Sequence, residues 1–185
     1  MLAALVLTAC AEQSPPLASA AAPPPVAAPA GPPRGIDVAT DASDMLNELK
    51  ASKVNFVARY YREPASRWPA LSASEAQRLS SLGMTIVAVW ESHSHNPDHF
   101  NYAWGYYDAV SAYRQASAVG QPTGSAIYFA VDFDAAPAMI GFVDQYFRGV
   151  TAGFAAAGGG RPRYKVGVYG SGAVCQALRY SFTCR

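Results

Sequence analysis

Five short apolar runs recur along the chain, and a segment with helical character separates each run from the next. The runs lie at residues 35–38, 56–61, 85–90, 126–132 and 165–170. They are continuous rather than alternating, which is typical of parallel strands that are buried on both faces and joined by helices. The sequence therefore predicts an α/β fold with five parallel strands, and helices near residues 41–51, 72–83, 102–119, 137–157 and after Ser171.

The connection that follows the first run carries neither a G-x-G-x-x-G motif nor a phosphate-binding loop. This disfavours a nucleotide-binding sheet. The other common parallel architecture is the (β/α) TIM-like barrel, which needs roughly 200–250 residues and places its sites at the C-terminal ends of its strands. The chain has 185 residues. We therefore expect an incomplete barrel with five of the eight strands, truncated at its C-terminal side.

Two N-terminal segments precede the expected barrel domain of residues 35–185. Residues 1–10 contain a short apolar run and end in Leu7-Thr8-Ala9-Cys10, which resembles a bacterial lipobox in which the cysteine is lipidated, although no Lys or Arg precedes the run. Residues 11–34 are almost entirely Ala, Pro, Ser and Gly and predict an extended linker. We expect an exported protein anchored to the membrane through Cys10. The alternative is a leader in which Cys10 has no role.

Charge and cysteine content add two expectations. The net charge is +1 and no basic run occurs, so nothing indicates nucleic-acid binding. In an oxidising compartment, Cys175 and Cys184 could form a disulfide that closes a short loop. Two unpaired cysteines are the alternative.

Polar side chains follow every predicted strand at its C-terminal end. In a barrel these ends meet at one rim, so we expect a shared site there. The candidate catalytic carboxylates are Asp37, Glu91, Asp132 and Asp134, and the candidate substrate-binding residues are Arg59, Tyr60, Tyr61 and Tyr169. Arg59 could instead form a structural ion pair with Asp37 or Glu91, and the tyrosines could simply be packed.

Asp132 and Asp134 come directly after the most apolar run. Side chains alternate along a strand, so residues spaced i, i+2 point to the same side. Paired carboxylates suit glycoside hydrolysis, in which one group protonates the leaving oxygen and another stabilises or attacks the sugar cation. The alternative is that both acids are exposed turn residues that cap the next helix.

These motifs occur together in a recognisable order: Gly35-Ile36-Asp37, Ala58-Arg59-Tyr60-Tyr61, Val89-Trp90-Glu91, Tyr128 to Asp134, and Val166 to Gly170. Together they resemble the bacterial glycoside-hydrolase-like TIM-barrel family, a distant relative of the family 25 muramidases. The resemblance covers about residues 35–180. It implies an exported barrel that acts on, or binds to, a peptidoglycan-like polysaccharide without a cofactor.

By this resemblance, Asp37 matches the first-strand acid of the muramidases, and Asp132 and Asp134 match their D-x-E pair. Asp134 is one methylene shorter than the expected Glu. In a glycosidase, Asp134 or Glu91 would be the general acid, Asp132 would stabilise the cationic charge, and Asp37 would orient the substrate.

Two alternatives remain. One is a glycan-binding lipoprotein that uses the same residues without turnover. The other is a metal-dependent hydrolase, because His93, His95 and His99 lie in one loop and an H-x-H pair beside carboxylates can bind Zn²⁺.

Overall fold

The structure of the chain, a computed structural model, describes residues 32–179 and 182–184. The expected signal segment, Cys10 and most of the expected linker lie outside these residues, so those expectations stay predictions. Among the residues described, no helix has both the length and the apolar character needed to cross a membrane.

Within the described residues, six parallel strands form one sheet, and strands that are consecutive in the chain are neighbours in the order β1-β2-β3-β4-β5-β6. The five predicted parallel strands are confirmed. The sixth was missed because two residues are too few to carry a sequence pattern. The strands are β1 (Gly35–Asp37), β2 (Phe56–Tyr61), β3 (Thr85–Trp90), β4 (Ala126–Val131), β5 (Lys165–Gly170) and β6 (Thr183–Cys184).

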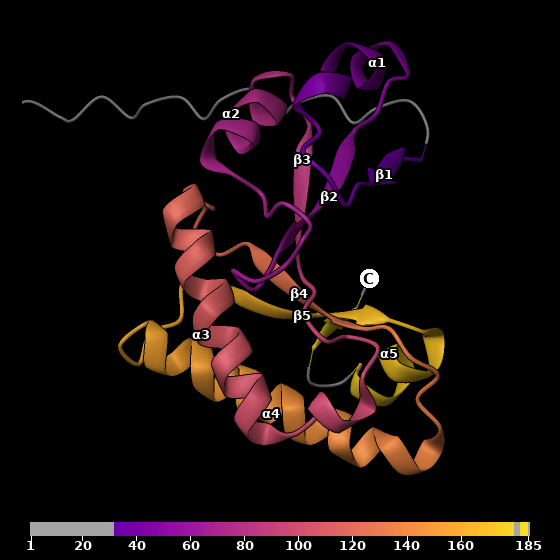
Figure 1. The fold of residues 1–185 in the computed structure, drawn as a ribbon, viewed down its shortest axis with the longest axis vertical. Coiled ribbons are helices and arrows are strands. Elements are labelled where there is room, and N and C mark those ends of the chain that lie inside the picture. The colour runs from indigo at the N-terminus through magenta and orange to yellow at the C-terminus, as the bar shows by residue number, and fades with distance from the viewer. Residues whose placement is uncertain (1–31, 180–181, 185) are drawn as a thin grey trace, which may run out of the picture. The chain divides into compact units, whose positions relative to one another are not determined.

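Helices connect the strands, as the apolar runs predicted (Figure 1). Short 3-10 turns precede α1, α3 and α4, at Ser43–Met45, Pro97–His99 and Pro137–Met139. The helices are α1 (Leu46–Ala51), α2 (Ala73–Ser81), α3 (Tyr102–Val119), α4 (Ile140–Ala157) and α5 (Gly172–Leu178). Ser72, Asn101 and Ser171 cap α2, α3 and α5, and each side chain accepts a backbone N–H of the first turn.

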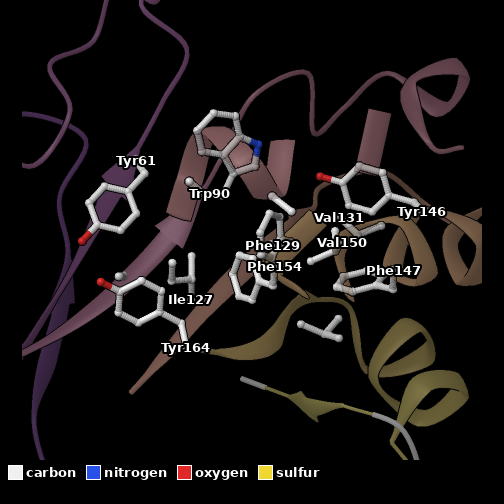
Figure 2. Packing of buried hydrophobic residues seen from close by; sticks show 14 of the residues in the cluster. Tyr61, Trp90, Ile127, Phe129, Val131, Tyr146, Phe147, Val150, Phe154 and Tyr164 are labelled. Carbon is white, nitrogen blue, oxygen red and sulfur yellow. The ribbon is translucent and has the colours of Figure 1, made fainter. Parts of the chain in front are cut away.

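The two faces of the sheet carry different residues, because side chains alternate along each strand. One face packs against α3 and α4 and forms the largest apolar core. Figure 2 shows part of this core, including Tyr61, Trp90 and Phe129 from the sheet and Tyr146 and Phe154 from α4. The opposite face carries a smaller cluster of buried residues, namely Tyr60, Val89, Tyr128 and Ala130, with Tyr169 packed against it.

Helices α3 and α4 lie side by side (Figure 1) and approach closely through glycines. A Cβ atom added to Gly105 would lie 2.0 Å from the Tyr146 carbonyl oxygen, and one added to Gly149 would lie 2.1 Å from the Tyr102 carbonyl oxygen. Only hydrogen fits at these positions, so the backbones themselves make the contact. The pair therefore forms one tightly packed support for the sheet.

Candidate functional site

Asp37, at the end of β1, accepts two hydrogen bonds from tyrosines on other strands. The Tyr60 hydroxyl of β2 donates to Oδ1 at 2.5 Å, and the Tyr169 hydroxyl of β5 donates to Oδ2 at 3.1 Å. Both carboxylate oxygens are therefore engaged, and the orientation of Asp37 is set by residues from β2 and β5. Of the predicted residues, these three are brought together directly.

The environment of both phenols keeps them protonated. Burial is the largest cause of the raised pKa of Tyr60, and the hydrogen bond to Asp37 adds to it. The pKa of Tyr169 is raised by burial and then by the negative charges of Asp37, Glu91 and Asp132. Three of the four predicted carboxylates thus act on one phenol, which indicates that they share a neighbourhood.

Glu91, directly after β3, forms an ion pair with Arg62. The Arg62 Nη1 atom lies 2.9 Å from Glu91 Oε2, and the Arg62 guanidinium also lies 4.4 Å from the centre of the Tyr60 ring. Arg62 is 8% exposed, and its backbone is held by Gln115 of α3, whose amide donates to the Arg62 carbonyl at 2.7 Å. Arg62 therefore connects Glu91 to Tyr60.

Sequence reasoning missed Arg62, although a signal was present. Arg62 is two residues beyond Tyr60, so strand alternation carried one position past β2 points it to the same face. The β2 motif drew attention to Arg59, Tyr60 and Tyr61, which are contiguous and cannot all face one side.

Two of those residues, Arg59 and Tyr61, do not lie where a substrate-binding residue was expected. The Arg59 side chain is fully buried on the helix-covered side, where its Nε lies 2.5 Å from Glu75 Oε1 and its Nη2 lies 3.0 Å from Glu75 Oε2. Its partner is thus Glu75 of α2 rather than Asp37 or Glu91, and it has no surface left for a substrate. Tyr61 is 1% exposed in the main core and donates to Gln121 Oε1 at 2.8 Å. Neither residue lies with the carboxylates.

Asp132 follows β4 and is open to solvent, with 61% of its side chain exposed. Its Oδ2 lies 3.2 Å from His95 Nδ1, and its backbone N–H donates to the Ser94 carbonyl at 2.9 Å. The connection between β3 and α3 is therefore attached to the end of β4 at Asp132.

Asp134 is placed differently from the expectation. Strand β4 ends at Val131, and the Asp134 carbonyl accepts the Ala136 N–H at 2.9 Å in a turn. The alternation rule therefore does not apply between Asp132 and Asp134. Asp134 is exposed, and its charge is not among those that raise the Tyr169 pKa.

Each of the three histidines contacts a different carboxylate. His93 Nε2 lies 3.3 Å from Glu63 Oε2, His95 contacts Asp132, and His99 Nε2 lies 3.0 Å from the buried Asp108 Oδ2. Within residues 32–179 and 182–184, no three His, Cys, Asp or Glu side chains are grouped to hold a metal ion.

Two further features lie outside the carboxylate group. A cavity of about 550 Å³ is bounded by α2, the end of α3 and the helix-covered face of the sheet, with Tyr61 and Gln121 in its wall. It is therefore on the face opposite to Tyr60.

The side chain of Cys184 is outside the described part of the chain, so its disulfide with Cys175 stays a prediction.

Comparison with curated proteins finds two relatives from Bacillus subtilis (strain 168). The chain is 28% identical to the uncharacterized protein FadG over 156 residues, which are 78% of this chain and 26% of FadG. It is 30% identical to the uncharacterized protein YbfG over 100 residues, which are 52% of this chain and 14% of YbfG. The chain thus spans about a quarter or less of the length of each relative.

Solved structures with the same fold include a secreted mycobacterial protein and an autolysin. The Mycobacterium tuberculosis Tat-secreted protein Rv2525c, in its complex with L-tartrate, matches with a TM-score of 0.57 and 22% identity over 78% of this chain and 71% of that one. An uncharacterized B. stearothermophilus protein matches with a TM-score of 0.57 and 19% identity over 80% of this chain and 68% of that protein. The modular autolysin LytC from Streptococcus pneumoniae, in complex with a synthetic peptidoglycan ligand, matches with a TM-score of 0.50 and 14% identity over 78% of this chain and 34% of LytC.

The sequence resemblance is borne out at the level of the family. The model of one family matches residues 47–183, which include β2 to β5, the first residue of β6, α2 to α5 and all of α1 except its first residue. The chain belongs to the Rv2525c-like, glycoside hydrolase-like domain family.

Proposed function

We propose that this protein is a glycoside hydrolase that acts on cell-wall or related polysaccharide with the carboxylates at the C-terminal ends of its strands. The observation that carries the proposal is Asp37 bonded by Tyr60 of β2 and Tyr169 of β5. Membership of a glycoside hydrolase-like family supports it, as does the shared fold of an autolysin that was solved with a peptidoglycan ligand.

The same contact supports a barrel-like curvature of the sheet. Strands β1 and β5 lie four strand spacings apart, which would be about 19 Å in a flat sheet. Tyr169 and Asp37 nevertheless lie 3.1 Å apart. Two side chains cannot reach across the flat distance, so the sheet curls until its first and fifth strands face one another. We therefore infer a partial (β/α) barrel with the site at its C-terminal rim.

We assign the roles from the partners of each group. Asp37 is held by two phenols and orients the substrate. Asp132 is exposed and stabilises the positive charge that develops on the sugar. Glu91 is the general acid in preference to Asp134, because its side chain is 22% exposed and it neighbours Tyr60 and Tyr169. Arg62 engages Oε2 of Glu91, so we assign Oε1 as the atom that carries the proton and donates it to the leaving oxygen.

The test is hydrolysis of peptidoglycan and other β-linked glycans, measured as release of reducing ends. Glu91→Gln and Asp132→Asn should each lower the rate by about 10²–10⁴-fold without loss of folding. Asp134→Asn is the matched control and should retain most of the activity. A wild-type protein that releases no reducing ends from any of these glycans would reject the hydrolase proposal.

Glycan binding without turnover is the second candidate. It is favoured by one observation: Asp37, Glu91 and Asp132 each already have a side-chain partner, so none of them stands ready with both oxygens free. Affinity for glycan in the absence of any release of reducing ends would support this candidate.

We further propose that the protein is exported and anchored by a lipid on Cys10. The motif Leu7-Thr8-Ala9-Cys10 and the Ala/Pro-rich linker motivate this proposal. Rv2525c, which shares the fold, is a Tat-secreted protein.

A further inference from the structure

Exposed aromatic side chains gather at the start of α3. Trp104 is 47% exposed and Tyr107 is 62% exposed, and their rings lie edge to face with centroids 6.4 Å apart. Large aromatic side chains gain most of their stabilisation from burial. Two of them left open beside each other therefore suggest a binding surface.

Two histidines extend this surface into a continuous stack. The Trp104 indole stacks on the His99 ring at 4.8 Å with an interplanar angle of 24°, and His99 is 4.9 Å from the His93 ring. His99 thus covers one side of the indole, while nearly half of the Trp104 surface remains exposed. We call His93, His99, Trp104 and Tyr107 the aromatic platform.

A buried polar group beneath the platform holds it in place. His99 is 5% exposed, and its Nε2 lies 3.0 Å from Asp108 Oδ2. Tyr146 of α4 donates to the same oxygen at 2.6 Å. Burial is the main cause that raises the Tyr146 pKa, so the phenol keeps its proton and remains a donor. The ring on which Trp104 rests is therefore fixed before any ligand arrives.

The platform is joined to the candidate site by a short connection. His93 and His95 flank Ser94, whose carbonyl accepts the Asp132 N–H at 2.9 Å, and His95 lies 3.2 Å from the Asp132 carboxylate. The segment that carries one end of the platform is thus bonded to a carboxylate to which we assign charge stabilisation.

We propose that the aromatic platform binds a further sugar ring of the same glycan chain. The C–H face of the sugar stacks on the open face of Trp104, and Tyr107, whose ring stands at 67° to the indole, contacts the edge of the sugar. This inference rests on the proposed function. The face of an aromatic ring is electronegative, and the axial C–H groups of a pyranose offer a complementary flat, weakly positive surface. The exposed rings of Trp104 and Tyr107 carry no charge and so suit an uncharged partner. The ligand we propose is therefore the uncharged body of a hexopyranose.

Binding can be tested apart from catalysis. Asp37→Asn, which lies outside the platform, serves as a background that limits turnover in the full chain. The probe is the β-1,4-linked hexamer of N-acetylglucosamine, titrated by calorimetry. Trp104→Ala and Tyr107→Ala should each weaken binding about tenfold, and Trp104→Phe should recover part of the loss.

Trp68→Ala is the matched control. Trp68 is 42% exposed and lies near Arg67, and no aromatic ring of the described residues stacks on it. Its loss should leave the affinity within about twofold. Near-ultraviolet circular dichroism confirms that each variant is folded.

The outcomes separate this inference from the proposed function. Unchanged affinity in folded Trp104→Ala, an equal loss in Trp68→Ala, or no binding by the parent protein would overturn the platform. Trp104-dependent binding in the Asp37→Asn background, together with a wild-type protein that releases no reducing ends, would uphold the platform and reject hydrolysis.

Discussion

The Tyr169 hydroxyl donates a hydrogen bond to Asp37, and replacement by Phe removes that donor with little change in shape. A hydrogen bond to a charged group contributes about 1.5–3 kcal/mol. If Asp37 must be held by both phenols, Tyr169→Phe should lower kcat/KM on peptidoglycan fragments about ten- to hundredfold.

Tyr61→Phe is the control for this measurement. The Tyr61 hydroxyl donates to Gln121 in the core, on the face of the sheet opposite to Tyr60. Its loss should lower stability slightly and leave kcat/KM unchanged. Equal kinetic losses in both variants would mean that Asp37 is not positioned by Tyr169.

Tyr146 gives the protein a dependence on alkaline pH. Burial, followed by the charge of Asp108, raises its pKa well above 10.0 in the folded state, whereas an unfolded tyrosine ionises near pH 10. Below pH 10 both states keep the proton. Above it only the unfolded state loses the proton, so the folding equilibrium constant falls by about tenfold per pH unit from this group.

Urea unfolding at several values from pH 8 to pH 11 measures this effect. The free energy of unfolding of Tyr146→Phe should fall less steeply with pH above pH 10. The substitution also removes a donor to Asp108 and so affects the bond between Asp108 and His99. Tyr107→Phe, at an exposed position, should keep the wild-type slope. Identical slopes for both variants would contradict the assignment.

Among the elements, the packing of α3 against α4 makes the sharpest prediction. Gly149→Ala would place a methyl group against the Tyr102 carbonyl, and backbone cannot move aside as a flexible side chain can. We expect a loss of about 1–3 kcal/mol in the free energy of unfolding.

Gly141→Ala, in the same helix, is the matched control because nothing lies within 4 Å of its added Cβ. Alanine favours a helix interior over glycine by about 1 kcal/mol. This variant should therefore be as stable as the wild type or slightly more stable. Comparable losses at both positions, measured by thermal or urea unfolding, would show that the close contact is not what Gly149 preserves.

The strands and helices were largely predictable because their signals are local. An apolar run of six residues depends only on neighbours in sequence, and the strands predicted from such runs are confirmed. Side-chain partners were harder. The Glu75 carboxylate accepts from the Ala42 N–H and bonds Arg59, and both partners lie far from it in sequence.

For the candidate site too, positions along the chain were predictable, whereas side-chain partners were not. Asp37, Glu91 and Asp132 stand at or directly after the ends of β1, β3 and β4, as the strand pattern predicts, and their charges all raise the pKa of Tyr169. Arg59 and Tyr61 lie on the helix-covered face, whereas Tyr60 and Arg62 lie with Glu91, because side chains alternate along a strand. Contiguous residues of one motif therefore do not share a site. The His99–Asp108–Tyr146 group joins residues from three segments and has no local signal.

For the whole molecule, we predict association with membranes. Expressed from its own start in a bacterial host, the chain should sediment with the membrane fraction, because a lipid on Cys10 would anchor it. Cys10→Ala should appear in the soluble fraction or as an unprocessed form. Cys175→Ala, in α5, is the control and should sediment like the wild type. A wild-type protein found only in the soluble cytosolic fraction would refute the anchor.

The bond between Asp37 and Tyr169 also sets the order of events while the protein is made, because the two residues are 132 positions apart. At about 5–20 residues per second, Tyr169 leaves the ribosome's active centre roughly 7–26 s after Asp37. During that interval the nascent chain can pair β1 with β2, yet Asp37 lacks its second donor. Asp37 would thus gain its second donor only after β5 has been synthesised, and the completed pair would report that β1 to β5 have all reached their register.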